Sequence, residues 1–466
     1  MLTARRLFAL LAALLAVSRA CHVGILWEGD AYPLAAAQQL LHGAALYRGL
    51  WFDKPPLLPF FYLLFGAQPG WPLRLADAVY LLLACWLAYR FAGELWSKRE
   101  GMWAAGLLAF FLIFDLPSAV IPIASDLLML APHLAAVWLA ARRRPFWCGA
   151  MAAVAFWISP KGAFVAAACV LWEPLGVLWI VAGFASVSAI AVACLAAMGA
   201  LGPWWDEVFR WGSLYAGSPF MEHPVRNALW RTLDWGGFHV TLVLAAAWFL
   251  TRGEKRLRWV GWLAVALIGV AAGMRFFPRY YFLLLPVLVT MAARGMTLLE
   301  GRWRDSVVLL LLIPFLRFGP PYVTAVRDAG WQDTAMDRDS RAAAALVRSL
   351  AKPGDTLFVW GYRPEIYVYT GLRAGTEYLD SQPLTGVPAD RHLTQSQPVE
   401  VEPARHRREE LTLTRPSFVL DGLGRYNPRL AIGSYPELRE WLRDYREIAR
   451  TPGTVMWELN KPNLRE

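Results

Sequence analysis

Charged residues are scarce in this chain: of its 466 residues, 18% are Asp, Glu, Lys or Arg, and 57% are hydrophobic. This apolar share exceeds what one soluble core of this length needs, which argues against an ordinary soluble protein. Lys and Arg equal Asp and Glu in number from Pro320 onward, so the net charge of +10 belongs to the residues before it. There the basic residues cluster in short loops between apolar blocks, where they set membrane orientation, so no nucleic-acid partner is expected.

Cysteine and histidine give no sign of a disulfide framework or a metal site. The cysteines all lie in apolar segments: Cys21, Cys85, Cys148, Cys169 and Cys194. Five histidines have no metal-ligand spacing and are predicted to be structural: His22, His42, His133, His223 and His239. A divalent cation bound by two or three carboxylates stays an open alternative, because such a site leaves no motif.

The apolar blocks are about 20 residues long, the length at which an α-helix crosses roughly 30 Å of hydrocarbon. They end near Phe318. We predict a polytopic α-helical membrane domain over residues 1–320 with about 11 spans, near 7–26, 72–94, 102–118, 124–141, 145–159, 162–173, 176–200, 237–251, 259–275, 279–293 and 305–319. Ser159-Pro160-Lys161-Gly162 interrupts one apolar run, so residues 145–173 are predicted to form two broken helices.

Short basic segments predict the orientation, because Lys and Arg concentrate in cytoplasmic loops. These segments hold Arg5 and Arg6, Lys98 and Arg99, Arg142 to Arg144, Arg252 to Arg258, and Arg294 to Arg304. The long loops 27–71 and 201–236 and a C-terminal domain over 330–466 are then extracytoplasmic. A cleaved signal peptide over residues 1–20 is the alternative for the first span, against which Arg19 argues.

The outer segments carry their own patterns. Apolar residues at helical spacing predict amphipathic helices along the membrane surface within loop 27–71. Five tryptophans in loop 201–236 are predicted to anchor it at the membrane interface rather than to stack on sugars: Trp204, Trp205, Trp211, Trp230 and Trp235. The C-terminal residues predict a small α/β domain with helices at 342–350 and 435–446, strands at 356–360, 417–420 and 454–459, and a mobile loop at 383–405.

The first outer loop also holds an unusual density of charged and aromatic residues. Glu28, Asp30 and Tyr32 open it, and Tyr47, Asp53 and Lys54 follow within Leu46–Leu57. Three carboxylates therefore lie where the first span emerges. Asp30 could instead begin a helix near Pro33, since Asp is a good N-terminal cap.

These residues resemble the motifs of the C-type membrane glycosyltransferases (GT-C) that use polyprenyl- or dolichyl-phosphate sugars, the family 39-like bacterial relatives of protein O-mannosyltransferase and lipid A aminoarabinose transferase. Asp30 matches the acidic motif, although Ala31 stands where the family usually has Glu, and Gly43 and Tyr47 match the middle element. Further matches are Lys54-Pro55-Pro56-Leu57, Ser125-Asp126-Leu127, Pro160-Lys161-Gly162 and Arg275 to Tyr281, in which relatives often have His at the position of Arg279. The resemblance covers roughly residues 5–320 and implies the GT-C fold and a lipid-phosphate-linked sugar donor.

Sugar transfer from such a donor explains the residue types. Asp30 is the predicted base that takes the proton of the attacking nucleophile. Lys54, Lys161, Arg275 and Arg279 are predicted to stabilise the leaving phosphate. Glu28, Tyr32, Tyr47, Asp53, Asp126 and Tyr280 are predicted to support the substrates, with Glu28 or Asp53 as a second carboxylate. Lys161 could instead pair with Asp126 for structure alone, and Lys54 could simply be solvated.

Two other functions remain open from the sequence. A transporter or flippase for a lipid-linked or small polar substrate would also use broken helices and intramembrane charges, but it usually shows two similar halves. A non-catalytic scaffold would make the carboxylates incidental. The acceptor, whether glycan, lipid or protein, and the sugar are not identified by any motif.

Overall fold

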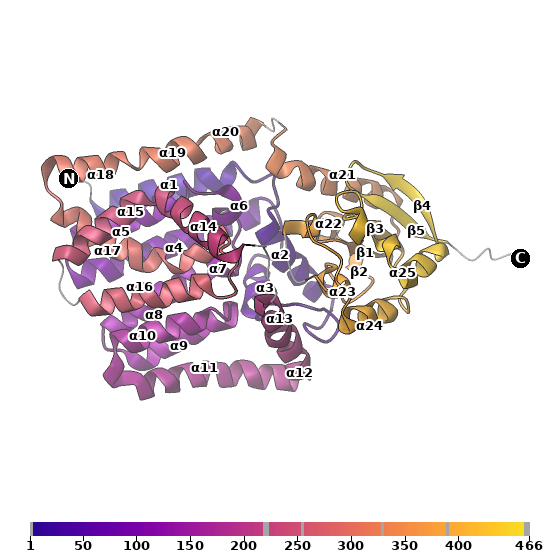
Figure 1. Ribbon diagram of the computed structural model, residues 1–466, viewed down its shortest axis with the longest axis horizontal. Coiled ribbons are helices and arrows are strands. Elements are labelled where there is room, and N and C mark those ends of the chain that lie inside the picture. The colour runs from indigo at the N-terminus through magenta and orange to yellow at the C-terminus, as the bar shows by residue number, and fades with distance from the viewer. Residues whose placement is uncertain (1–2, 218–222, 253–255, 328–329, 388–390, 461–466) are drawn as a thin grey trace, which may run out of the picture.

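The computed structural model describes residues 3–217, 223–252, 256–327, 330–387 and 391–460. A large helical half holds the N-terminal residues, and a small sheet domain holds the C-terminal ones (Figure 1). Within the first part, the helices are α1 (Ala4–Ala20), α2 (Glu28–Leu41), α3 (Leu57–Leu63), α4 (Trp71–Leu95), α5 (Lys98–Phe111), α6 (Pro117–Val120), α7 (Ser125–Leu128), α8 (Leu130–Ala141), α9 (Pro145–Ile158), α10 (Gly162–Trp172) and α11 (Val177–Ala197).

The second outer loop and the remaining helices follow. They are α12 (Leu201–Trp204), a π-helix (Trp205–Arg210), α13 (Trp211–Gly217), α14 (Pro224–Phe238), α15 (Val240–Arg252), α16 (Arg256–Ala271), a 3₁₀ turn (Pro278–Leu283), α17 (Leu285–Leu298), α18 (Gly301–Leu309), α19 (Leu312–Phe318) and α20 (Pro320–Arg327). Each of the eleven predicted spans contains a helix.

Three helical segments are long and apolar enough to cross a membrane by themselves: Trp71–Leu95, Pro174–Ala197 and Gly301–Arg327. The pair α14 and α15 also passes this test together but is bent by 88°. Several other apolar helices are shorter, so the count of eleven crossings stays a prediction. The two broken helices at 145–173 are confirmed as α9 and α10. Gly162 is required at the break, because a Cβ there would lie 2.1 Å from the backbone nitrogen of Phe156.

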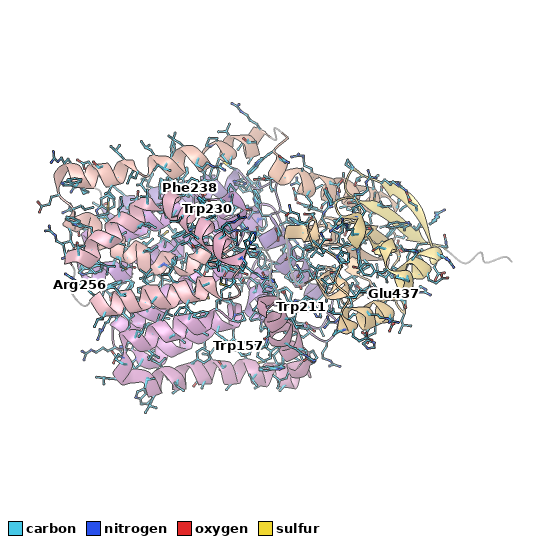
Figure 2. All side chains as sticks on the ribbon, viewed as in Figure 1. Trp157, Trp211, Trp230, Phe238, Arg256 and Glu437 are labelled. Carbon is cyan, nitrogen blue, oxygen red and sulfur yellow. The ribbon has the colours of Figure 1, made fainter. Side chains whose placement is uncertain are left out.

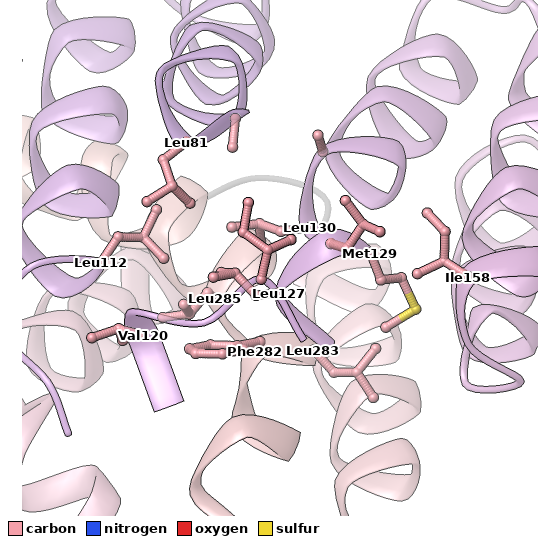
Figure 3. Packing of buried hydrophobic residues seen from close by; sticks show 14 of the residues in the cluster. Leu81, Leu112, Val120, Leu127, Met129, Leu130, Ile158, Phe282, Leu283 and Leu285 are labelled. Carbon is pink, nitrogen blue, oxygen red and sulfur yellow. The ribbon is translucent and has the colours of Figure 1, made fainter. Parts of the chain in front are cut away.

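The membrane half has one continuous apolar core (Figure 3). It forms where α4, α8, α9 and α17 contact one another and where short segments fold between them. Leu81, Leu127, Met129 and Leu285 meet there, each at most 1% exposed. The unwound stretches between helices are therefore buried in protein, as non-helical backbone at membrane depth must be.

The C-terminal domain has a five-stranded sheet in the order β2-β1-β3-β5-β4. Its strands are β1 (Thr356–Trp360), β2 (Arg373–Ala374), β3 (Phe418–Asp421), β4 (Tyr445–Arg450) and β5 (Val455–Leu459). β2, β1 and β3 are parallel, and β5 is antiparallel to both β3 and β4. The helices around it are α21 (Ala335–Leu350), α22 (Glu365–Thr370), α23 (Gln382–Thr385), α24 (Glu402–Leu411) and α25 (Pro436–Trp441).

The predicted α/β elements are confirmed except at one end. The predicted helix over 435–446 is wrong beyond Trp441, because a 3₁₀ turn at Leu442–Asp444 leads into β4. Pairing with β5 decides this, with Arg446 opposite Glu458. The predicted loop at 383–405 includes parts of α23 and α24 as well as a 3₁₀ turn at Arg391–Leu393, while residues 388–390 lie outside the described part.

Helix α2 joins the two halves. It was predicted to lie along the membrane surface, but residues from Asp30 to Ala37 are buried, because α2 packs against α3 on one side and α22 of the C-terminal domain on another. Gln39 fixes the junction: its Nε2 donates to the carbonyl of Leu372 (3.2 Å), and its Oε1 accepts from Ala374 N–H (2.8 Å). The C-terminal domain is thereby hydrogen-bonded to the first outer loop.

The tryptophans of the second outer loop divide into two groups. Trp205 and Trp230 remain exposed, as membrane anchors would be. Trp204, Trp211 and Trp235 are buried instead. Trp211 lies beside the C-terminal domain (Figure 2), where the Arg407 guanidinium lies 5.7 Å from the centre of its ring and Trp51 meets it edge-on at 5.5 Å between centroids. This part of the loop therefore holds the two halves together.

Candidate functional site

A cation and a carboxylate meet where α9 and α10 are broken. Lys161 Nζ forms an ion pair with Asp126 Oδ1 at 2.8 Å and lies over the ring of Tyr280 at 2.9 Å. Asp126 lies in the first turn of α7, and Tyr280 comes from the 3₁₀ turn before α17. The ion pair between Lys161 and Asp126, which the sequence offered as an alternative to phosphate binding, is therefore present. It lies within a larger group of charges.

Arg279 belongs to the same group. It interacts electrostatically with Glu28, Asp126 and Tyr280, and both Arg279 and Lys54 act repulsively on Lys161. Among the residues that the structure describes, the Arg279 guanidinium has no hydrogen bond and no ion pair within 4 Å. Three predicted phosphate-binding cations are thus gathered, and one of them has all its N–H donors available.

Tyr47 positions Lys54. Its hydroxyl donates to the carbonyl of Lys54 at 2.7 Å, and its backbone has a φ of +67°. Gly43, shortly before it, has a φ of +92°, a conformation that favours glycine and explains this residue in the motif. Lys54 pairs with the adjacent Asp53, whose side chain is 12% exposed. The first outer loop thereby places a second cation and carboxylate next to the Lys161 group.

Asp30 lies elsewhere. It is fully buried in the first turn of α2 and does not cap the helix, which begins at Glu28. Its Oδ2 pairs with Arg74 Nη1 at 2.9 Å, and its Oδ1 accepts from the Tyr62 hydroxyl and from Ile123 N–H, both at 2.9 Å. This arrangement favours a positioning role, because both carboxylate oxygens are already occupied by the protein.

Arg275 is also separate from the three cations. Its Nη2 donates to the carbonyl of Tyr215 at 2.6 Å, and the guanidinium lies 3.6 Å from the centre of the Tyr215 ring. The Tyr215 hydroxyl in turn lies 3.1 Å from that of Tyr280. Arg275 therefore ties the second outer loop to the site rather than facing it with a free guanidinium.

The C-terminal domain contributes residues that the sequence did not reveal. His392 Nε2 lies 3.4 Å from Glu28 Oε2, and the Tyr362 ring lies 5.9 Å from that of Tyr32. Asp380 interacts electrostatically with Asp53 and Lys54. No motif marks these residues. Two of them follow the parallel strands β1 and β2, and that position is their only signal in the chain.

Burial controls protonation at this junction. It raises the pKa of Asp380 to about 7, an effect that Asp53 reinforces and the backbone N–H of Gln382 opposes. It raises the pKa of Glu207 to about 9 against a hydrogen bond from Phe52 N–H. Burial likewise raises the pKa of the Tyr362 hydroxyl well above its usual value. Tyr362 is therefore a hydrogen-bond donor at neutral pH.

A metal site is not apparent in the described ranges. They contain no group of three or more His, Cys, Asp or Glu side chains arranged to hold an ion. The carboxylates Glu28, Asp53 and Asp126 are instead distributed among His392, Lys54 and Lys161. No residue set is assigned to a divalent cation.

The chain is similar to known proteins in both sequence and fold. Residues 53–204 match the family model of dolichyl-phosphate-mannose-protein mannosyltransferase. No curated protein sequence matches the chain. The fold is similar to that of ArnT from Cupriavidus metallidurans bound to undecaprenyl phosphate, with a TM-score of 0.59 and 14% identity over 97% of each chain.

Two further solved structures share the architecture. Apo ArnT from the same organism aligns with a TM-score of 0.56 and 13% identity over 93% of each chain. The Archaeoglobus fulgidus oligosaccharyltransferase in complex with zinc and sulfate aligns with a TM-score of 0.51 and 14% identity over 97% of this chain and 73% of that chain. The helical half with its small C-terminal sheet domain is thus a known multi-pass membrane architecture.

Proposed function

We propose that this chain is a membrane glycosyltransferase of the C type (GT-C) that transfers a sugar from a polyprenyl-phosphate donor to an extracytoplasmic acceptor. The observation that carries the proposal is the Arg279 guanidinium, which has no hydrogen-bond partner among the described residues yet lies in one electrostatic group with Lys161 and Lys54. An arginine with free donors beside two lysines suits a phosphate.

The reaction needs cations that stabilise the leaving phosphate and a base that takes a proton from the acceptor. The nucleophile of the acceptor bonds to the anomeric carbon, and the bond from that carbon to the phosphate oxygen breaks. The phosphate leaves with the electron pair, and Arg279, Lys161 and Lys54 stabilise its charge. A carboxylate takes the proton of the nucleophile. The stereochemical course depends on the face of attack.

Asp53 is better placed than Asp30 to be this base. One Asp53 oxygen pairs with Lys54, and the other accepts no hydrogen bond from a described residue. Asp30 would first have to give up its contacts with Arg74, Tyr62 and Ile123. We therefore assign the proton transfer to Asp53 and the positioning of α2 to Asp30, with Asp30 as the alternative base.

The position of the site in the cell follows from the loop charges. The motif loop meets the C-terminal domain where Glu28 lies near His392, and Arg279 interacts with both Glu28 and Asp126, the partner of Lys161. The positive-inside rule places that region outside the cytoplasm. A multi-pass protein of a bacterial plasma membrane, with its C-terminal domain extracytoplasmic, fits this arrangement. Protease cleavage of the domain in intact spheroplasts would support it, and cleavage only after lysis would contradict it.

Transfer of radiolabelled sugar from synthetic polyprenyl-phosphate donors in proteoliposomes tests the function. Arg279→Gln is expected to lower transfer about a hundredfold, the loss typical of one donor to a developing negative charge. Arg48→Gln is the matched control, because this arginine is exposed and donates to the carbonyl of Met198. Transfer that survives Arg279→Gln contradicts the assignment. A wild type that moves the lipid across the bilayer without consuming it favours the flippase.

A further inference from the structure

The junction between the halves has a second group of residues whose polar atoms are free. Tyr362 follows β1, and Asp380 follows β2 at the carboxyl edge of the parallel strands. Gly361 and Ser381 join the two segments, since Gly361 N–H donates to Ser381 Oγ at 2.9 Å and Ser381 N–H donates to the carbonyl of Gly361 at 3.3 Å. Tyr362 and Asp380 thus lie side by side. This edge of an open α/β sheet is where ligands usually bind.

Aromatic rings of the membrane half face this edge. Tyr32 in α2 lies 5.9 Å from Tyr362 between ring centroids. Tyr32 also stacks on Phe52 at 4.9 Å with 24° between the ring planes. Phe52 directly precedes Asp53, the proposed base. The rings connect the C-terminal domain to the reacting end of the site.

Tyr362 lies near charges of both signs. It interacts electrostatically with Glu28, Asp380 and Asp53 and with Arg279. Its hydroxyl has no hydrogen-bond partner in the part of the chain that the structure describes. The side chain is partly exposed, so its hydroxyl can donate a hydrogen bond to a ligand.

Asp380 has the same property and is buried more deeply. The carboxylate is only 1% exposed, and Gln382 N–H donates to its Oδ1 at 2.7 Å. Its Oδ2 accepts no hydrogen bond from any described residue. This oxygen is therefore available to accept a hydrogen bond from a ligand.

We propose that Tyr362 and Asp380 bind the sugar ring of the donor and select a neutral, hydroxyl-rich sugar over an acidic one. Asp380 accepts from a ring hydroxyl, the Tyr362 hydroxyl donates to another ring oxygen, and the face of Tyr32 packs against the C–H groups of the sugar. A sugar carboxylate would be repelled by Asp53. This inference rests on the proposed function, because it takes the phosphate to lie at Arg279.

Binding to the protein in nanodiscs separates the two proposals. Three probes are compared: polyprenyl phosphate alone, the same lipid with a neutral hexose and the same lipid with a hexuronic acid. We expect the wild type to bind the neutral sugar lipid at least about fivefold more tightly than the bare lipid, the value of one good hydrogen bond. The acidic sugar lipid is expected to bind no more tightly than the bare one.

Tyr362→Phe and Asp380→Ala are expected to abolish the preference for the neutral sugar and to leave the affinity for the bare lipid unchanged. Asp444→Ala is the control, because Asp444 is an exposed residue of the same domain that forms an ion pair with Arg415. A preference that persists in both variants overturns the inference, as does a wild type that binds the acidic sugar lipid equally well. If Arg279→Gln leaves the affinity for polyprenyl phosphate unchanged, that result counts against the proposed function instead.

Discussion

Two ion clusters begin at neighbouring residues of α2 and differ in how completely they are paired. In the first, Asp30 accepts three hydrogen bonds, and Arg74 donates to Asp30 and to the carbonyls of His22 and Ile25. In the second, Glu28 faces His392 and Arg279, and the guanidinium of Arg279 has no hydrogen bond among the described residues.

The difference separates structure from function within one helix. Charges that satisfy each other fix the geometry of the chain, because a substrate gains nothing from groups that are already paired. Charges with free donors or acceptors are held next to one another at a cost, which a bound ligand would offset. This comparison assigns Asp30 to the scaffold and Arg279 to the phosphate.

The largest expected effect breaks the ion cluster around Asp30, in which both Asp30 oxygens accept hydrogen bonds. Arg74→Met should lower the free energy of unfolding by about 3–5 kcal/mol, since it leaves Asp30 buried without its cation and Asp77 with Arg19 alone. Thermal unfolding in detergent, followed by tryptophan fluorescence, measures it. Arg90→Met on the same helix is the control, because its pair with Glu94 is exposed and should contribute less than about 1 kcal/mol. Equal melting temperatures for the two variants would show that the buried cluster is not structural.

The next largest effect distinguishes Asp53 from Asp30 by the loss of sugar transfer. Asp53→Asn should lower transfer about a hundredfold with little change in melting temperature, as expected for a base that the fold does not need. Asp30→Asn should lower the melting temperature and leave much of the activity per folded molecule. Transfer assays and thermal scans on the same preparations measure both. The opposite pattern, a stable Asp30→Asn protein without activity, would restore Asp30 as the base.

The sequence predicted the elements of this fold better than their environment. Apolar blocks located helices in all eleven segments, and the strand-like apolar run at Thr356–Trp360 located β1, because these patterns are local. The burial of α2 was not predicted, since it depends on contacts with α22, more than 300 residues later. A helix that looks amphipathic can lose its solvent face to another domain.

The site was predicted in part for the same reason. The family motifs predicted that Lys54, Asp126, Lys161 and Arg279 belong to one site, because residues that act on one substrate recur as recognisable motifs. They did not predict that Arg74 forms an ion pair with Asp30, or that the C-terminal domain contributes Tyr362 and Asp380. The position of Arg74 near the start of a predicted span was a signal for the ion pair. The contribution of Tyr362 and Asp380 depends on how the C-terminal domain packs against the membrane half, which no local pattern reveals.

The smallest expected effect concerns Glu207, a carboxylate that accepts a hydrogen bond, as Asp30 does, but has no cation paired with it among the described residues. Glu207 in the π-helix is buried, and its carboxylate accepts a hydrogen bond from Phe52 N–H in the loop 27–71 at 2.7 Å. Burial raises its pKa from 4.5 to about 9, so the folded chain holds a proton that the unfolded chain loses as the pH rises above 4.5. The stability that the protonated Glu207 contributes to the fold is therefore fully present below pH 4.5 and is lost as the pH rises towards 9.

Glu207→Gln should remove this dependence, because glutamine keeps an acceptor for Phe52 N–H and cannot ionise. The melting temperature of the variant should exceed that of the wild type by a few degrees at pH 8 and match it near pH 4.5, where both side chains are neutral. Glu410→Gln is the control, since this glutamate is exposed on α24 and pairs only with His406. If the wild type and Glu207→Gln lose stability in parallel from pH 5 to 8, Glu207 is ionised in the folded chain and belongs with the paired charges.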